Sequence, residues 1–241
     1  MSQAQELSGK VAVITGASRG IGFAIAEALA SRGCSVVITA RQQTSADEAA
    51  GKVAHLHGRA VGFECDVRNA QSIERLFSFV QQEFKHLDFL INNAGIYGPA
   101  VNFAETSIEG WRDAINVNLT GTFLCSKFAL PLMKPGSVIV NNLSIAAYEV
   151  FPNSGAYIAS KQGALGLTKA MREDLRSRGI RVIALVPGAT DTEIWQQFWP
   201  EAPRQKMLQP KTVAGAVVNA LLLPAEASVD EIRIMPASGK L

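Results

Sequence analysis

The hydrophobic and polar positions of this chain follow two alternating patterns. Short apolar runs rich in β-branched residues are each followed by a longer stretch in which apolar residues recur at helical spacing. The clearest runs span residues 11–15, 36–39, 89–91, 138–141 and 182–186, with weaker ones at 60–65 and 231–235. The helical stretches span residues 20–32, 46–57, 70–84, 111–133, 155–178 and 211–223. Because parallel strands need a crossover connection, the alternation predicts an α/β fold, a doubly wound parallel sheet of about seven strands with helices on both faces.

The length and apolar content fit one unit of this kind. A chain of 241 residues with 48% apolar content can bury one large core, so we expect residues 1–241 to form a single domain. The long segment that follows neither pattern is 188–210. Irregular segments of that length in compact domains are usually functional or disordered.

The composition argues against several classes of function. The formal net charge is +2 and the basic residues are scattered, so we expect neither nucleic acid nor a membrane as a partner. Nowhere do about 18 apolar residues run together, and the polar residues 1–9 lack an apolar stretch of signal-peptide length. Cys34, Cys65 and Cys125 are odd in number and form no Cys-x-x-Cys pair, which favours neither a disulfide framework nor a zinc site. We therefore expect a cytoplasmic protein that uses no metal.

A glycine-rich turn joins the first predicted strand to the first predicted helix. It reads Thr-Gly-Ala-Ser-Arg-Gly-Ile-Gly over residues 15–22. Glycines there let the backbone approach a pyrophosphate, whose charge is favoured by the free N–H groups at the helix N-terminus. The spacing is G-x-x-x-G-x-G rather than G-x-G-x-x-G, and a tight turn without a ligand is the alternative. The candidate cofactor contacts are Gly16, Ser18, Arg19, Gly20, Ile21 and Gly22.

The end of the second strand bears on which dinucleotide is bound. A site that prefers NAD usually carries an acidic residue about 20 positions past the glycine turn. This chain has Thr-Ala-Arg at residues 39–41. Arg41 can bind a 2′-phosphate bidentately, and Arg19 can approach it from the turn. The prediction is NADP(H) in preference to NAD(H), and the alternative is that both arginines are ordinary solvated charges.

Two further strand ends carry candidate cofactor contacts. Asp66, followed by Val67, can accept a hydrogen bond from an adenine amino group. The sequence Asn-Asn-Ala-Gly at residues 92–95 offers amides that can hold adjacent loops and a glycine that admits a cofactor closely. Either group can equally be a helix cap or a turn. The candidates in the second group are Asn93, Ala94 and Gly95.

Three residues are candidates for chemistry. Tyr157 and Lys161 are four positions apart in a predicted helix, so they share a face, and a nearby ammonium favours a phenolate. Ser144 follows the strand that starts at residue 138, and ligands of open α/β sheets bind outside the carboxyl ends of strands. Its hydroxyl is placed to polarise a substrate carbonyl. A Tyr-x-x-x-Lys pair by itself commonly marks only an exposed helix face.

All these groups occur in one order, together with Asn118 in Asn-Val-Asn-Leu-Thr-Gly and with Pro-Gly-Ala-Thr-Asp-Thr at 187–192. The order resembles the classical short-chain dehydrogenase/reductase family over essentially the whole chain. The resemblance implies a single Rossmann-type domain in which Tyr157 is the general acid/base and Ser144 orients the substrate oxygen. It implies that Lys161 lowers the pKa of Tyr157 and binds the nicotinamide ribose. It also implies a water held by Asn118 in a proton relay and a nicotinamide carboxamide embraced by Pro187, Gly188, Thr190 and Thr192.

The resemblance makes residues 188–210 a mobile substrate lid. Aromatic side chains in this segment would suit an apolar or aromatic carbonyl compound, and the alternative is that they pack against the core or a neighbouring subunit. The candidate substrate contacts are Ile145, Trp195, Phe198 and Trp199. Relatives that reduce 3-oxoacyl groups on a carrier protein often have a glycine-rich tail and several basic residues before the Ser144 strand. This chain ends Met-Pro-Ala-Ser-Gly-Lys-Leu and has only Lys134 there.

We therefore expect an NADP(H)-dependent carbonyl reductase or alcohol dehydrogenase acting on a small or medium apolar substrate. A 3-oxoacyl thioester reductase is the second interpretation, and a dinucleotide-sensing regulator without turnover is the third.

A stripe of small residues in the helix 155–178 indicates another backbone close by, in the same subunit or a neighbour: Ala159, Gly163, Gly166 and Ala170. The resemblance implies pairing of this helix and the 111–133 helix across two-fold axes, so we expect a homotetramer, or failing that a homodimer.

Overall fold

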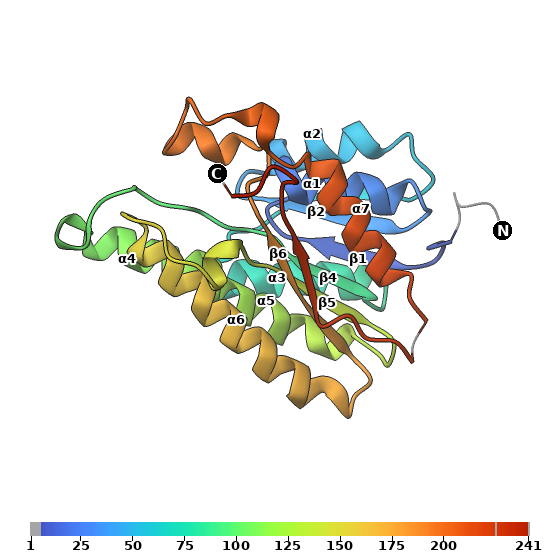
Figure 1. Ribbon diagram of the computed structural model, residues 1–241. Helices are drawn as coiled ribbons and strands as arrows, with labels where there is room; N and C mark the ends of the chain where they lie inside the picture. Colours follow the sequence, from blue (N-terminus) through green and yellow to red (C-terminus); the bar gives the residue numbers. More distant parts are fainter. Residues whose placement is uncertain (1–5, 225, 241) are drawn as a thin grey trace.

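The chain forms one parallel sheet of seven strands in the order β3-β2-β1-β4-β5-β6-β7, as the computed structural model in Figure 1 shows. The structure describes residues 6–224 and 226–240, so residues 1–5 of the polar N-terminal segment considered above lie outside it. The strands are β1 (Val11–Ile14), β2 (Ser35–Ala40), β3 (Ala60–Glu64), β4 (Phe89–Asn92), β5 (Val138–Asn142), β6 (Arg181–Pro187) and β7 (Glu231–Ile234). Both of the weaker runs in the sequence are therefore strands, at β3 and β7.

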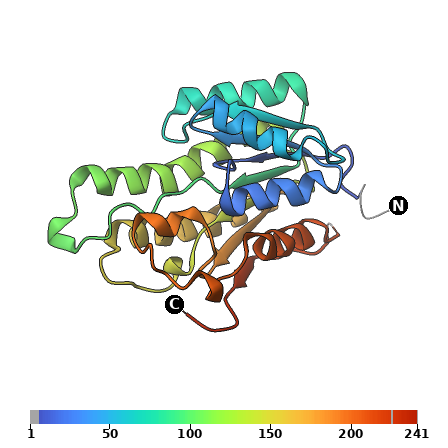
Figure 2. The same ribbon diagram turned by 90° about the horizontal axis from the view of Figure 1, so that it is seen from above.

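Helices cover both faces of this sheet (Figures 1 and 2). One face carries α1 (Gly20–Ala30), α2 (Gln43–Val53) and α7 (Pro210–Leu221), and the other carries α3 (Ala70–Glu83), α4 (Ile108–Ile115), α5 (Gly121–Ala129) and α6 (Gly155–Arg176). Alternate residues of a strand point to opposite faces, and in β1 Ala12 and Ile14 pack on the first face while Val11 and Val13 pack on the second. Burial on both sides accounts for continuous apolar runs rather than alternating ones.

The strand order places the ends of β1 and β4 side by side, although Thr15 and Ile91 are 76 positions apart in the sequence. β1 pairs with β2 on one side and with β4 on the other, so the chain reverses its direction of winding between β1 and β4. Open α/β sheets bind ligands at the carboxyl ends of strands at such a switch point. The glycine-rich turn after β1 and the Asn-Asn-Ala-Gly segment after β4 meet there.

The structure corrects the predicted helix at residues 111–133. It begins earlier, at Ile108, because the Ser107 hydroxyl caps it by accepting a hydrogen bond from the Gly110 backbone N–H at 3.0 Å. It is also not one regular helix: a π-helical turn at Asn116–Thr120 separates α4 from α5, and a 3₁₀ turn at Leu130–Leu132 follows. Single π turns inside helices occur frequently at functional sites, and this one contains Asn118.

The predicted irregular segment at 188–210 contains only short 3₁₀ turns, at Glu193–Gln197 and Arg204–Lys206, before α7 begins at Pro210. A single bridge between Thr190 and Leu208 closes its base. In the part of the chain that the structure describes, no helix is both long and apolar enough to cross a membrane.

Candidate active site

The glycine-rich turn between β1 and α1 brings the backbone close to the segment after β4. Gly16 has a φ of +59°, and a Cβ atom there would lie 2.8 Å from the Cα of Ala94, so this position requires glycine. Arg19 is the N-cap of α1 and its side chain makes no capping hydrogen bond. The N–H groups of the first turn are therefore available to an anionic group such as a pyrophosphate.

A chain of hydrogen bonds runs from this turn to the candidate lysine. The Asn93 side-chain amide donates to the backbone oxygens of Thr15 at 2.9 Å and of Gly16 at 3.0 Å. Its oxygen accepts a hydrogen bond from the Asn142 amide at 2.8 Å, and the Asn142 backbone oxygen accepts one from Lys161 Nζ at 2.9 Å. The carboxyl ends of β1, β4 and β5 are thus fixed relative to one another, and to Lys161 on α6.

Asn118 is buried in the π turn and its amide is engaged by the protein. Its Nδ2 donates to the backbone oxygen of Ile96 and to Ser160 Oγ, both at 2.9 Å, and its Oδ1 accepts from the Ile96 backbone N–H at 2.9 Å. Asn118 thereby positions the segment that contains Gly95, where a Cβ would lie 3.6 Å from Lys161 Nζ. The water relay that the resemblance implies would use an acceptor position left on Asn118, either the second lone pair of its Oδ1 or its backbone carbonyl, to which the Thr122 hydroxyl donates at 3.0 Å.

Tyr157 and Lys161 lie on the same face of the first turns of α6, at the end of β5. Lys161 is 5% exposed, and its Nζ is 5.7 Å from the centre of the Tyr157 ring. Burial lowers the pKa of Lys161 to about 8. Burial also raises the pKa of Tyr157 to about 12, an effect that the Ser144 side chain partly offsets by hydrogen bonding and that Tyr97 reinforces. The expected lowering of the Tyr157 pKa by Lys161 is not found in the protein itself, because desolvation of the hydroxyl dominates.

Ser144 lies just beyond β5 and starts a 3₁₀ turn at Ile145–Ala147. Its hydroxyl accepts a hydrogen bond from the Ala146 backbone N–H at 3.2 Å, which leaves its own hydrogen available to another acceptor. Ile145 is buried within the same turn. The structure therefore brings Ser144 and Tyr157 together, as the resemblance implies, while Ile145 packs into the protein.

Ion pairs already engage two of the predicted cofactor contacts. The Asp66 carboxylate binds the Arg68 guanidinium at 2.7 Å, and the hydrogen bonds from Arg68, with a weaker contribution from Arg41, lower the pKa of Asp66. Arg19 pairs with Glu193 of the irregular segment, with 2.6 Å between Nη1 and Oε2. Arg41 is exposed directly after β2. Of the two arginines, Arg41 is thus the one that a 2′-phosphate could reach without displacing a carboxylate seen in the structure.

Some residues of segment 187–192 pack within the protein, and one of them lies over the glycine-rich turn. Gly188 packs against the residues that follow β7, where a Cβ would lie 2.9 Å from the Met235 sulfur, so its small size serves packing of the C-terminal segment. Thr190 is buried and its hydroxyl donates to the Gly188 backbone oxygen at 3.0 Å. The Thr192 methyl lies over the glycine-rich turn, 3.2 Å from where a Cβ on Gly20 would be. Of these three residues, Thr192 comes closest to the turn.

The Tyr97 ring packs against Tyr157, and further aromatic rings pack beyond it. The Phe198 ring stacks on the Tyr97 ring with 3.8 Å between centroids, and the Tyr97 ring lies 4.7 Å from that of Tyr157. The Trp195 ring centroid lies 5.0 Å from that of Phe198 and 6.0 Å from that of Trp199. The Trp199 side chain is 40% exposed at the outer end of this group of rings. Tyr97 was not predicted from the sequence. The available signal was its position two residues after the Asn-Asn-Ala-Gly segment, at the carboxyl end of a strand.

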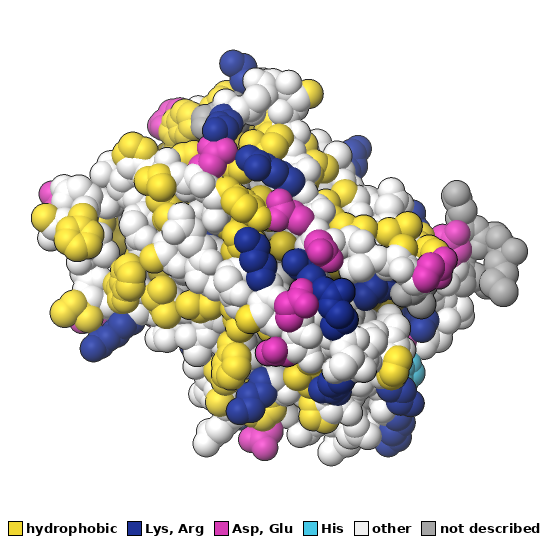
Figure 3. All heavy atoms as spheres, turned by 60° about the horizontal axis from the view of Figure 1, so that its bottom comes forward, with side chains coloured by type: hydrophobic (Ala, Val, Ile, Leu, Met, Phe, Trp, Pro, Cys, Tyr) yellow, Lys and Arg dark blue, Asp and Glu magenta, His cyan; other side chains and the backbone are white. Residues whose placement is uncertain are grey.

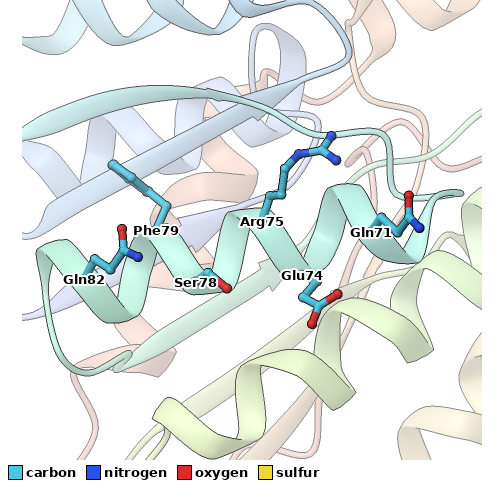
Figure 4. Close-up of a pocket in the computed structure, with 6 residues that line it drawn as sticks. All are labelled: Gln71, Glu74, Arg75, Ser78, Phe79 and Gln82. Carbon is cyan, nitrogen blue, oxygen red and sulfur yellow. The ribbon is translucent and has the colours of Figure 1, made fainter.

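A separate hollow on the outer surface of α3 does not belong to this site. All six residues that line it come from that one helix, so it is an open depression rather than an enclosed cavity (Figure 4). Within the described residues, no group of three or more His, Cys, Asp or Glu side chains is arranged to hold a metal ion.

Comparison with known proteins identifies the family. The model of the short chain dehydrogenase family matches residues 10–203. This chain belongs to the short-chain dehydrogenase family. A 3-oxoacyl-[acyl-carrier-protein] reductase from Synechocystis is 35% identical over 231 residues, which cover 92% of this chain and 93% of the relative.

Solved structures of the family agree with this assignment. A short chain dehydrogenase from Burkholderia cenocepacia in complex with NADP has a TM-score of 0.88 and 29% identity, covering 96% of this chain and 98% of the other. A 3-ketoacyl-(acyl-carrier-protein) reductase from Brucella melitensis complexed with NADH has a TM-score of 0.87 and 28% identity over the same shares. This short-chain dehydrogenase is thus an oxidoreductase that acts on CH–OH and C=O groups with a nicotinamide dinucleotide.

The geometry predicts the effect of removing the Tyr157 hydroxyl. Tyr157→Phe keeps the ring, so NADPH binding should survive, while turnover should fall by at least the ~10²-fold typical of general acid–base catalysis. Steady-state kinetics and a fluorescence titration with NADPH would measure both. Tyr148→Phe is the matched control, because Tyr148 is exposed and bonds Glu231 at the edge of β7. Near-normal turnover by Tyr157→Phe would remove Tyr157 from the role of acid.

Burial of Lys161 predicts a stability change that depends on pH. Its pKa falls from 10.5 to about 8 on folding, so the charged lysine disfavours the folded state by about 3 kcal/mol below pH 8, and this penalty vanishes as pH rises through 10.5. Lys161→Met carries no such penalty. It should be more stable than the parent at pH 7, by less than the full penalty because the hydrogen bond to Asn142 is lost, and the advantage should shrink by pH 10.

Urea unfolding at pH 7 and pH 10 tests this expectation. Lys169→Met is the control, since Lys169 is exposed on the same helix and should show no pH-dependent difference. A Lys161→Met protein that is less stable than the parent by the same amount at both pH values would contradict the account.

Proposed function

We propose that this short-chain dehydrogenase is an NADP(H)-dependent reductase of carbonyl groups in small or medium apolar compounds, with residues 188–210 as the substrate lid of a single domain. The observation that carries the proposal is that Tyr157, with Ser144 and Lys161 beside it, lies at the carboxyl edge of the sheet next to the Tyr97 ring, on which Phe198 of the lid segment stacks. This is the place where the glycine-rich turn would hold a dinucleotide.

The residues of the site divide the work of reduction. The nicotinamide supplies the hydride to the carbonyl carbon. Ser144 hydrogen-bonds the carbonyl oxygen as negative charge develops on it, and Tyr157 donates the proton. A Tyr157 pKa of about 12 keeps this hydroxyl protonated at neutral pH, ready to act as an acid. For the reverse reaction, bringing that pKa to roughly 7 needs about 7 kcal/mol of further stabilisation of the phenolate, for which a bound cationic nicotinamide would be a source.

The preference for NADP(H) rests on Arg41. It occupies the place after β2 where an acidic residue would favour NAD, and Arg19 lies on the adjacent turn. The Burkholderia relative was solved with NADP and the Brucella relative with NADH, so both dinucleotides occur on this fold. The exposed guanidinium of Arg41 is what favours the phosphorylated one here.

The second candidate activity is reduction of a 3-oxoacyl thioester. The name of the Synechocystis relative favours it. The sparse basic residues near Lys134 disfavour a carrier-bound substrate, and the aromatic rings of the lid favour a free apolar compound. Family membership favours an enzyme over a dinucleotide sensor without turnover.

The decisive experiment is a screen of NADPH oxidation against aldehydes, ketones, quinones and 3-oxoacyl esters. We expect turnover with apolar aldehydes, ketones or quinones that exceeds turnover with 3-oxoacyl esters. Turnover confined to 3-oxoacyl esters would establish the second candidate, and turnover of none of these classes by folded, NADPH-binding protein would overturn the proposal.

Arg41→Ala tests the choice of cofactor. Loss of a charge-assisted hydrogen bond to the 2′-phosphate should weaken NADPH binding by roughly 1.5 to 3 kcal/mol and leave NADH binding nearly unchanged. Titration of both dinucleotides measures this. Arg59→Ala is the control, because Arg59 lies at the amino-terminal end of β3, away from the carboxyl ends of the strands, and pairs with Glu83. Equal losses for NADPH and NADH would show that Arg41 does not read the phosphate.

We also propose that the enzyme is a homotetramer, with a homodimer as the alternative. On the small-residue stripe of α6, Gly163 packs against Leu119 of the same chain, where a Cβ would lie 3.0 Å from its Cδ2, but Gly166 and Ala170 are exposed. Apolar side chains of α4 and α5 are exposed nearby: Ile108, Trp111 and Phe123. Figure 3 shows apolar side chains gathered toward the left of the face, the side on which α4 lies in Figure 1. Such a surface is typical of an interface between subunits.

Light scattering at micromolar concentration tests the assembly. We expect a mass of four times, or at least twice, the 25.8 kDa of the chain. Phe123→Glu would place a charge on the exposed apolar surface and should shift the mass toward the monomer. A parent protein that is monomeric at this concentration would contradict the proposal.

A further inference from the structure

An ion pair joins the glycine-rich turn to the lid segment. Arg19, the residue before α1, contacts Glu193, the first residue of the 3₁₀ turn at Glu193–Gln197, with 2.6 Å between Nη1 and Oε2. Only one nitrogen of the guanidinium makes this contact. Both side chains are more than half exposed, so the pair contributes little to the stability of the fold. Its clearer consequence is that it holds the Arg19 guanidinium toward the lid.

The backbone that precedes Glu193 is held in place by other contacts. Arg204 Nη1 donates to the Thr192 backbone oxygen at 2.6 Å and lies 3.0 Å from Asp191 Oδ1. The Thr192 methyl lies over the glycine-rich turn. The Glu193 carboxylate is therefore presented to the turn by contacts that do not involve Arg19.

Arg19 also extends from the part of the turn that adjoins the end of β2. The Ala17 backbone N–H of the turn donates to the Thr39 backbone oxygen of β2 at 2.9 Å. Arg19 and Arg41 each follow one of these two bonded residues by two positions. In a dinucleotide fold of this kind, the ribose 2′ position lies near the end of the second strand. A 2′-phosphate that binds Arg41 therefore lies next to the segment that carries Arg19.

We propose that Glu193 is a specificity-determining residue that competes with the 2′-phosphate of NADP(H) for Arg19 and so reduces the preference for NADP(H) over NAD(H). This inference rests on the proposed binding of that phosphate at Arg41. NADPH exchanges the single contact between Arg19 and Glu193 for a bidentate, charge-assisted contact with the phosphate. NADH has no acceptor there and leaves the ion pair in place. The cost of breaking the pair thus falls on NADPH alone, and specificity is a difference of two affinities.

Glu193→Gln tests the competition, because it removes the charge and keeps the size of an exposed side chain. NADPH and NADH are each titrated into the parent and the variant, and the ratio of their dissociation constants is compared. The dissociation constant of NADPH should fall about twofold to fivefold relative to that of NADH, the range that an exposed ion pair supplies. Any effect of the Glu193 charge on the pyrophosphate cancels in this ratio, since both dinucleotides carry a pyrophosphate.

A double-mutant cycle shows whether Glu193 acts through Arg19. In an Arg19→Ala background, Glu193→Gln should leave the ratio unchanged. Glu201→Gln is the control in the parent background, because it removes an exposed carboxylate from the same segment and should also leave the ratio unchanged.

The outcomes separate this inference from the proposed cofactor preference. A ratio that Glu193→Gln does not change, or changes by the same factor without Arg19, would overturn the inference while the preference through Arg41 stands. A ratio that Arg41→Ala leaves unchanged would show that the phosphate does not bind beside the turn, and would overturn both.

Discussion

The arrangement depends on one unfavourable feature, a lysine ammonium buried at the carboxyl edge of the sheet. Lys161 is 5% exposed, and desolvation lowers its pKa to about 8. The same desolvation raises the pKa of Tyr157 beside it. Each group by itself destabilises the fold in its charged form. In the proposed function, the two together place a protonated acid and a nearby cation where a carbonyl would meet a hydride donor. The surrounding structure serves to hold this pair in position.

Hydrogen bonds from side-chain amides hold the Tyr157–Lys161 pair in position. The Asn93 and Asn142 amides link the glycine-rich turn, β4 and β5 to one another, and the Asn142 carbonyl receives Lys161. The Asn118 amide fixes the segment after β4 from the other side. In the proposed function, this one hydrogen-bonded framework would place both a dinucleotide on the turn and a substrate at Tyr157. The proposed lid, residues 188–210, differs, since a single β-bridge closes its base and the Phe198 ring stacks on Tyr97.

Much of the fold was predictable from local patterns in the sequence, whereas parts of the site were not. Apolar runs buried on both faces and the helices between them identify all seven strands, because parallel sheets need crossovers. The π turn around Asn118 was not predictable, since it depends on hydrogen bonds to Ile96, which is distant in sequence. The raised Tyr157 pKa was missed for the same kind of reason: i,i+4 spacing places a lysine nearby but says nothing of how far the hydroxyl is desolvated.

Titration of the Tyr157 phenolate by ultraviolet difference absorbance tests the central claim most directly. The chain has three tyrosines, so subtracting the titration of Tyr157→Phe from that of the parent isolates this residue. Without dinucleotide, the account predicts no ionisation of Tyr157 at neutral pH, because burial raises its pKa to about 12. With NADP⁺ bound, the positive charge of the nicotinamide ring should lower the pKa of Tyr157 by several units, into a pH range in which the protein stays folded. Ionisation of Tyr157 near neutral pH in the protein alone, or no change on adding saturating NADP⁺, would contradict the account.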